Sequence, residues 1–235
     1  MKMRLLTALL TAVALAACSS PAAQQPTITL TFIRHGESQA NADGVVDTTV
    51  PGPALTALGQ EQAATLADKL KDGGYDAVYS SQMLRSEQTA APTAKALGKQ
   101  VTVLPGLNEI SAGWFEGVEM KDMSNTLLLG PQGWLKGDRR YGIPGSVNGN
   151  QFNGAFTTAV QKIYDSGDKK PLAFSSGLAI MMWTLLNVTN ARSSLLTDHP
   201  LPNAGRVVVT GNPDVGWTLT EWDGITNFGP DDKAA

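Results

Sequence analysis

The sequence predicts an α/β fold: a three-layer sandwich whose mostly parallel sheet is covered by helices on both faces, with an antiparallel strand at its edge. Short apolar runs typical of strands alternate along the chain with longer segments of helical spacing. Polar loops follow these strands, and two further strand-like runs near the C-terminus are separated by a turn sequence. Such alternation is typical of parallel sheets with helical connections.

The expected elements follow from this pattern in chain order. Strands are predicted where β-branched and aromatic residues cluster: residues 27–33, 77–80, 101–103 and 171–174, and a C-terminal hairpin of 206–210 and 216–222. Helices are predicted at residues 57–71, ended by Gly73-Gly74, at 84–97, ended by Gly98, and at 152–164 and 178–186. Because parallel strands point the same way, the loops after the first four strands should meet at one edge of the sheet.

The N-terminus has the order of features found in bacterial export signals. Lys2 and Arg4 precede an apolar stretch, residues 5–14, that is too short to span a bilayer comfortably. The segment that ends it, Leu15-Ala16-Ala17-Cys18, resembles the lipobox of bacterial lipoproteins, in which the cysteine is lipidated and becomes the mature N-terminus. The alternative is an ordinary signal peptide with a chance cysteine.

This pattern predicts three regions. Residues 1–17 would be a lipoprotein signal peptide, residues 18–26 a lipidated Cys18 with a flexible tether, and residues 27–235 one domain. Cys18 is the single cysteine of the chain, so no disulfide can form within it. The domain would then be anchored by lipid to the outer face of the plasma membrane, in the cell envelope.

Charge and composition argue against several classes of partner. The chain has 18 Lys and Arg against 21 Asp and Glu, and no basic run is longer than two residues. This pattern does not favour nucleic acid as a partner. Two histidines and one cysteine without paired spacing do not suggest a metal site. No feature of the sequence indicates an oligomeric state.

The first predicted strand runs directly into Arg34-His35-Gly36. In open α/β sheets ligands bind at the carboxyl ends of strands. A histidine there can attack phosphorus, and an arginine beside it can hold phosphoryl oxygens. The alternative interpretation is a capped strand end with a solvated Arg-His pair.

Three later loops are expected at the same edge. Arg85 lies just past the second strand, Glu109 lies beyond the third, and Ser175-Ser176-Gly177 follows the fourth. Taken singly, Arg85 is equally consistent with a surface residue at a helix start, and Glu109 with a solvated acid. Their shared position makes a single polar site the sharper hypothesis.

These motifs together resemble the histidine phosphatase superfamily, also called the phosphoglycerate mutase-like family. The matching marks are Arg34-His35-Gly36, a Ser-x-x-x-Arg-x-x-x-Thr-Ala segment from Ser81 to Ala90, and a Glu-x-x-x-Gly-x-x-x-Gly segment from Glu109 to Gly117. The resemblance covers about residues 27–210 and is nearest to the actinobacterial envelope lipoproteins of the family.

The resemblance implies a two-step phosphoryl transfer on a small phosphorylated substrate, without metal or other cofactor. His35 would form a phosphohistidine, Arg34 and Arg85 would bind the non-bridging oxygens, and Glu109 would act first as acid and then as base. Asn41 would touch the phosphate or the substrate, or else cap a turn.

One position departs from the family pattern. The fourth strand of the family ends in a second phosphate-binding histidine, where this chain has Ser176. Exchanging a charge-assisted contact for a hydroxyl is expected to cost about 2–4 kcal/mol of transition-state stabilisation, or roughly 30- to 1,000-fold in rate. Ser176 would still contact phosphate, helped by the N–H groups of the following helix. His199 is either a substitute for the missing ring or a surface loop residue.

Residues 117–150 fall where such folds carry a cap, and Arg139 and Arg140 either contact a substrate anion or are solvated. Trp114, Phe115 and Trp134 either line an apolar wall or pack in the core. Export favours hydrolysis over mutase chemistry. Two hypotheses remain: an envelope phosphomonoesterase, and a degenerate relative that binds a phosphorylated ligand or a partner without turnover.

Overall fold

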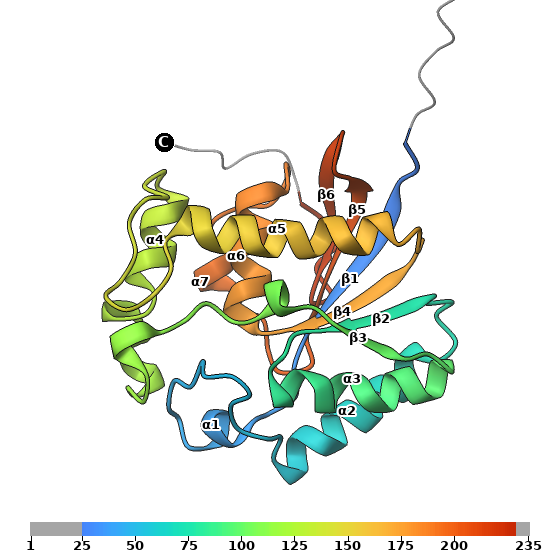
Figure 1. Cartoon of the computed structure of the whole chain (residues 1–235), viewed down its shortest axis with the longest axis horizontal. Coiled ribbons are helices and arrows are strands. Elements are labelled where there is room, and N and C mark those ends of the chain that lie inside the picture. Colours follow the sequence, from blue (N-terminus) through green and yellow to red (C-terminus); the bar gives the residue numbers. More distant parts are fainter. Residues whose placement is uncertain (1–24, 229–235) are drawn as a thin grey trace, which may run out of the picture.

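Six strands form one mixed sheet in the order β3-β2-β4-β1-β5-β6 in the computed structural model, which describes residues 25–228 (Figure 1). The strands are β1 (Ile28–Arg34), β2 (Ala77–Ser80), β3 (Val101–Val103), β4 (Pro171–Ser175), β5 (Arg206–Asn212) and β6 (Gly216–Trp222). Strands β3, β2, β4 and β1 run parallel, β5 pairs antiparallel with β1, and β6 pairs antiparallel with β5. The predicted fold class is therefore confirmed, with the C-terminal hairpin as the antiparallel part.

Helices cover both faces of this sheet (Figure 1). The helices are α1 (Gln39–Ala42), α2 (Ala57–Leu70), α3 (Leu84–Leu97), α4 (Leu129–Leu135), α5 (Gly149–Asp165), α6 (Gly177–Asn187) and α7 (Leu195–Asp198), with short 3₁₀ helices η1 (Pro105–Leu107), η2 (Gly113–Phe115) and η3 (Met120–Asn125). Neighbouring residues of β1 show the two layers: Phe32 packs in the cluster on the α5 and α6 side, whereas Ile33 packs with α2 and α3. No helix within residues 25–228 is long and apolar enough to cross a membrane.

The helix boundaries follow local capping. At α2 the hydroxyl of Thr56 accepts a hydrogen bond from the Gly59 amide, and at α3 Gly98 adopts a left-handed conformation that ends the helix. Helix α5 begins at Gly149, three residues before the predicted start. Asn148 and Gln151 form a capping box there, which places the first turn ahead of the apolar spacing.

Residues 117–150 contain η3 and α4 and lie beside the start of α5. Trp134 is buried in this region, stacks on Phe152 at 5.6 Å between ring centroids and donates from Nε1 to the Tyr141 carbonyl at 2.8 Å. Of the two interpretations of this ring, core packing is the one found. Trp114 is 81% exposed and lines no part of the core.

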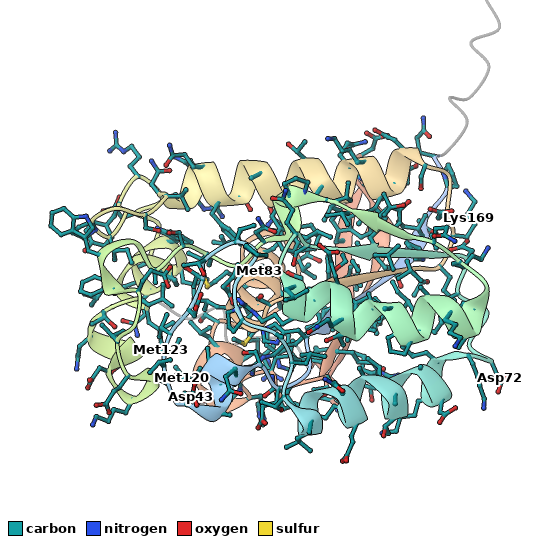
Figure 2. The ribbon with its side chains drawn as sticks, turned by 60° about the horizontal axis from the view of Figure 1, so that its bottom comes forward. Asp43, Asp72, Met83, Met120, Met123 and Lys169 are labelled. Carbon is teal, nitrogen blue, oxygen red and sulfur yellow. The ribbon has the colours of Figure 1, made fainter. Side chains whose placement is uncertain are left out.

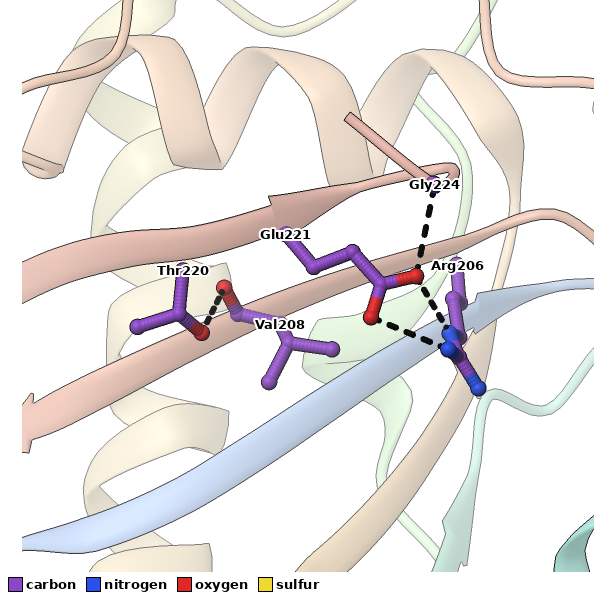
Figure 3. Close-up of polar contacts among 5 residues, drawn as sticks. All are labelled: Arg206, Val208, Thr220, Glu221 and Gly224. Carbon is purple, nitrogen blue, oxygen red and sulfur yellow. Dashed lines mark hydrogen bonds and ion pairs between the residues drawn. The ribbon is translucent and has the colours of Figure 1, made fainter. Parts of the chain in front are cut away.

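The C-terminal hairpin is held by a bidentate ion pair. Arg206 donates from Nε and Nη2 to the carboxylate of Glu221, at 2.7 and 3.0 Å (Figure 3). The same carboxylate accepts from the Gly224 amide, and Thr220 donates to the carbonyl of Val208. Since Arg206 lies in β5 and Glu221 in β6, these contacts join the two strands of the hairpin.

The two ends of β1 carry different features. At its start, the carbonyls of Gln25 and Pro26 accept hydrogen bonds from Asn212 and Tyr164, each at 3.0 Å. At its other end the strand runs into Arg34 and His35. The predicted region 1–17, and residues 18–24 of the predicted region 18–26, lie outside the described residues.

Candidate active site

The loops that follow β1, β2, β3 and β4 meet at one edge of the sheet, as the parallel order requires. Contacts link the predicted residues there: Arg85 reaches the ring of His35, and Glu109 reaches the first turn of α6. Arg34 packs against Gly177, where an added Cβ would lie 3.0 Å from its Cδ. His35, Arg34, Arg85, Glu109 and Ser176 therefore form one cluster.

His35 is held as a neutral imidazole with a defined tautomer. Its ring is 3% exposed, and its Nδ1 lies 2.7 Å from the Gly36 carbonyl oxygen, to which it donates. Its Nε2 lies 3.0 Å from Nε of Arg85. Because arginine can only donate, Nε2 must be the acceptor, so the ring proton is assigned to Nδ1. Burial, then the charges of Arg85 and Arg34, hold the pKa of His35 well below its usual 6.5.

Two buried arginines offer hydrogen-bond donors around this ring. Arg85 is 3% exposed, and its Nη2 donates to the Asp47 carbonyl at 3.2 Å and contacts the Met83 sulfur at 3.0 Å. Arg34 donates from Nη1 to the Leu201 carbonyl at 2.6 Å. Within residues 25–228, Arg34 Nε and Arg85 Nη1 are buried without a partner. Unpaired buried donors are costly, and an anion would satisfy them.

Burial lowers the pKa of both arginines, against the opposing charge of Glu109. An arginine nevertheless stays protonated in proteins. The pocket therefore carries two positive charges beside a neutral nucleophile, which is the charge pattern a phosphoryl group needs.

Ser176 lies fully buried at the N-terminus of α6, and its hydroxyl makes no capping contact with the helix. The hydroxyl instead approaches the sulfur of Met83, at 3.5 Å. Met83 thus stands between Ser176 and Arg85, at the beginning of α3 in the interior (Figure 2). Sulfur is a weak acceptor, so both donors remain available to a stronger one. Met83 looks like an ordinary apolar residue in the sequence, which gave no signal of this contact.

The carboxyl group of Glu109 is fixed by two backbone amides. Oε1 accepts from the Ile110 amide at 2.8 Å, and Oε2 accepts from the Leu178 amide at 3.2 Å. Burial raises the pKa of Glu109, while these amides and the charge of Arg85 oppose the rise. The first turn of α6 is expected to direct its N–H groups at an anion, and one of them binds the carboxyl group of Glu109. This contact places Glu109, a group that can transfer protons, beside Ser176.

Asn41 caps a turn and lies near the nucleophile at the same time. It forms a capping box with Ser38, whose amide donates to Asn41 Oδ1 at 3.3 Å. The same Oδ1 accepts from Nδ2 of Asn203 at 3.0 Å, and this Nδ2 also donates to the His35 carbonyl at 3.1 Å. Asn203 was not singled out from the sequence because a lone Asn in a Pro-Asn-Ala-Gly loop is typical of any turn.

Three predicted residues do not join the cluster. Arg139 donates from Nη2 to the Leu186 carbonyl, at the end of α6 opposite to Ser176 and about 14 Å along the helix. The side chains of Arg140 and His199 are exposed and make no hydrogen bond within the described part of the chain. The solvated-loop alternatives describe Arg140 and His199.

Thr89, a motif residue without an assigned role, joins two parts of the site. Its hydroxyl accepts from the Gly36 amide at 3.0 Å and donates to the Arg85 carbonyl at 2.7 Å. Gly36 in turn lies so close to α2 that an added Cβ would be 2.6 Å from the Gly59 carbonyl oxygen. The nucleophile loop is therefore fixed between α2 and α3, which explains the need for glycine at position 36.

A parallel sheet edge with a buried neutral histidine between two arginines, and a carboxylic acid beside them, defines a phosphoryl-transfer protein of the histidine phosphatase type. The family model of the histidine phosphatase superfamily (branch 1) matches residues 30–224, and the chain belongs to this superfamily.

The chain is also similar to individual members. It is 47% identical over 214 residues to the PE-PGRS family protein PE_PGRS11 of Mycobacterium tuberculosis, which covers 84% of this chain but 37% of that protein. It is 35% identical over 133 residues to the adenosylcobalamin/alpha-ribazole phosphatase of Escherichia coli, which covers 57% of this chain and 63% of that enzyme. The chain thus spans less than two thirds of these two relatives.

Among solved structures, a mycobacterial glucosyl-3-phosphoglycerate phosphatase superposes with a TM-score of 0.69 and 18% identity, covering 85% of this chain and 100% of that one. At this identity the likeness shows the shared fold. The predicted family and fold class are confirmed.

Proposed function

We propose that the chain is a phosphatase that hydrolyses small phosphomonoesters through a phosphohistidine on His35. The observation that carries this proposal is the Nε2 lone pair of a buried neutral histidine, placed 3.0 Å from Arg85 among donors without partners. Such donors suit the charge that spreads over the equatorial oxygens during phosphoryl transfer.

In the first step, His35 Nε2 attacks phosphorus as the bond from phosphorus to the ester oxygen breaks. Glu109 in its protonated form gives its proton to the leaving oxygen, so the alcohol departs neutral. In this structure Arg85 Nε–H donates a hydrogen bond to the lone pair of Nε2. Before His35 attacks, this N–H must change its acceptor from Nε2 to a phosphoryl oxygen. The Nδ1–H···O contact with Gly36 then stabilises the positive ring that results.

In the second step, water attacks phosphorus in line with the bond to Nε2. Glu109, now ionised, takes the water proton as the N–P bond breaks, which returns His35 to its neutral form and releases inorganic phosphate. Ser176 supplies one neutral hydrogen bond to the phosphoryl group, and the rate is therefore expected to fall below that of members with a charged group there.

The two histidines of the chain give a matched test. Soluble protein without residues 1–18 should hydrolyse p-nitrophenyl phosphate, bind orthovanadate and show an acid-labile phosphohistidine after quenching. His35→Ala should lose all three, whereas His199→Ala, which changes an exposed ring, should keep them. Turnover that survives His35→Ala would refute the mechanism.

A second function rests on Ser176 and Met83. Their contact leaves the pocket without the second imidazole of the family pattern, which favours a protein that binds a phosphorylated ligand without turnover. In that case the parent binds vanadate but does not hydrolyse. Turnover should then appear in Ser176→His, made alone and with Met83→Ala to give the new ring space.

We also propose that the protein is a lipoprotein of the cell envelope, anchored through Cys18. The order of residues in Leu15-Ala16-Ala17-Cys18 supports this proposal. In cells fed labelled palmitate, the full chain should take up label and partition into detergent. Cys18→Ala should do neither.

A further inference from the structure

We infer that Asn203 is the positioning residue of this pocket: it fixes the backbone of His35 and turns the amide of Asn41 so that its donor side is left for the substrate. The inference rests on the proposed phosphatase function and assigns a role to a residue outside the family motifs of this sequence.

The segment Leu201–Gly205, between α7 and β5, forms hydrogen bonds to both Arg34 and His35 at the end of β1. The Asn203 side chain and the Ala204 amide both donate to the His35 carbonyl, at 3.1 and 3.2 Å. The carbonyls of Leu201 and Gly205 accept from the side chain and the amide of Arg34, at 2.6 and 2.9 Å. Both residues that face the phosphoryl group are therefore held by one short segment.

The backbone of this segment is strained where it meets His35. Ala204 adopts φ 59°, a left-handed conformation that residues other than glycine rarely take. In this structure its amide donates to the same His35 carbonyl that Asn203 binds. Strained residues persist where surrounding contacts over-determine them, and the bonds of Asn203 supply those contacts.

Asn203 also decides which side of the Asn41 amide faces outward. Its two side-chain protons are both used, one on the His35 carbonyl and one on Asn41 Oδ1. The Ser38 amide donates to the same Oδ1, so two donors hold this oxygen inward. Asn41 Nδ2 makes no hydrogen bond among residues 25–228, and its two protons are available to a phosphoryl or substrate oxygen.

The test compares Asn203 with an asparagine that makes equivalent bonds elsewhere. Asn190 binds the amide and the carbonyl of Leu219 through its side chain, at 2.7 and 2.9 Å, in the loop after α6. Asn190→Ala therefore controls for the loss of two partly buried hydrogen bonds. Asn203→Asp keeps the shape of the side chain and removes both donors, and Asn203→Ala removes the group.

The measurements are the single-turnover rate of phosphohistidine formation, KM, the Kd for orthovanadate and the thermal midpoint. We expect both Asn203 variants to form phosphohistidine about 10- to 100-fold more slowly and to bind vanadate more weakly, because small misplacements of reacting groups have effects of this size. Asn190→Ala should match their loss of midpoint while keeping parental rate and affinity. Asn41→Ala should raise KM, and adding it to Asn203→Ala should change KM no further.

Equal rates and equal vanadate affinities in the Asn203 and Asn190 variants would overturn the positioning role. Turnover that survives His35→Ala would instead overturn the proposed mechanism, and the vanadate comparison would still decide the role of Asn203. If the parent shows no turnover, the vanadate affinities of the Asn203 and Asn190 variants are the test of the role of Asn203. A parent that binds no vanadate overturns both proposals.

Discussion

Arg85 Nε and His35 Nε2 lie 3.0 Å apart. The guanidinium that would bind the phosphate therefore donates a hydrogen bond to the lone pair that would attack it. The planar guanidinium makes this double use possible, because Nε and the two Nη atoms donate in different directions. A lysine ammonium cannot hold that arrangement.

Arg85→Lys should therefore lower kcat/KM by about 100-fold, the usual loss when a preplaced transition-state donor is removed. The measurement is steady-state hydrolysis of p-nitrophenyl phosphate. Arg140→Lys, at an exposed position, should leave kcat/KM unchanged. A fully active Arg85→Lys variant would show that a point charge is sufficient.

The rate of phosphohistidine formation should follow a bell-shaped pH profile. The reactive state needs neutral His35, whose pKa lies below 6.5, and protonated Glu109, whose pKa lies above 4.5. The rate should thus fall with acid as His35 is protonated, and with base as Glu109 ionises. Single-turnover rates over pH should lose the alkaline limb in Glu109→Gln.

Stability should also respond to the buried imidazole. The folded state holds the pKa of His35 below its unfolded value, so the unfolded chain binds the proton more readily. The stabilisation by neutral His35 is present above about pH 6.5 and is lost as pH falls from there towards the folded pKa. The free energy of unfolding of the parent, measured with urea, should fall as the pH is lowered over this range. His35→Gln should remove this part of the pH dependence.

Thr89 should be needed for its hydroxyl rather than its shape. Thr89→Val keeps the volume but leaves the buried Gly36 amide unpaired, at a cost of about 1–3 kcal/mol in the free energy of unfolding. Thr89→Ser keeps the hydroxyl and should recover most of this loss. Equal unfolding free energies for the two variants would contradict the role of the bond.

Gly177 should limit the room for Arg34. An added Cβ would lie 3.0 and 3.1 Å from Cδ and Nε of Arg34, so Gly177→Ala should displace the guanidinium and weaken phosphate binding. Gly154→Ala is the matched control, since a Cβ at that position in α5 meets nothing within 4 Å. Isothermal titration with orthovanadate should separate the two variants.

The site residues that follow the strands could be predicted because the signal for each lies within a short stretch of sequence. Arg34, Arg85 and Glu109 each follow a short apolar run, and a parallel sheet brings such positions together whatever the packing between them. The predicted bounds of α3 are also those observed, since Gly98 ends the helix by its own conformation.

The remaining parts of the pocket depend on contacts between distant segments. Asn203 reaches His35 across 168 positions, and Met83 meets Ser176 across 93. Neither contact leaves a periodic or spaced signal, because each residue type is also common in turns or cores. The sequence left Arg139 between a substrate contact and a solvated loop for a similar reason: its partner is a helix carbonyl that only the tertiary fold supplies.

Strand β1 links the entry of the chain to its nucleophile. The backbone contacts of Gln25 and Pro26 lie at the amino end of the strand, and His35 lies about 23 Å away at the carboxyl end. The candidate pocket and the residues that lead into β1 therefore lie at opposite ends of the same strand, and the strand alone connects them.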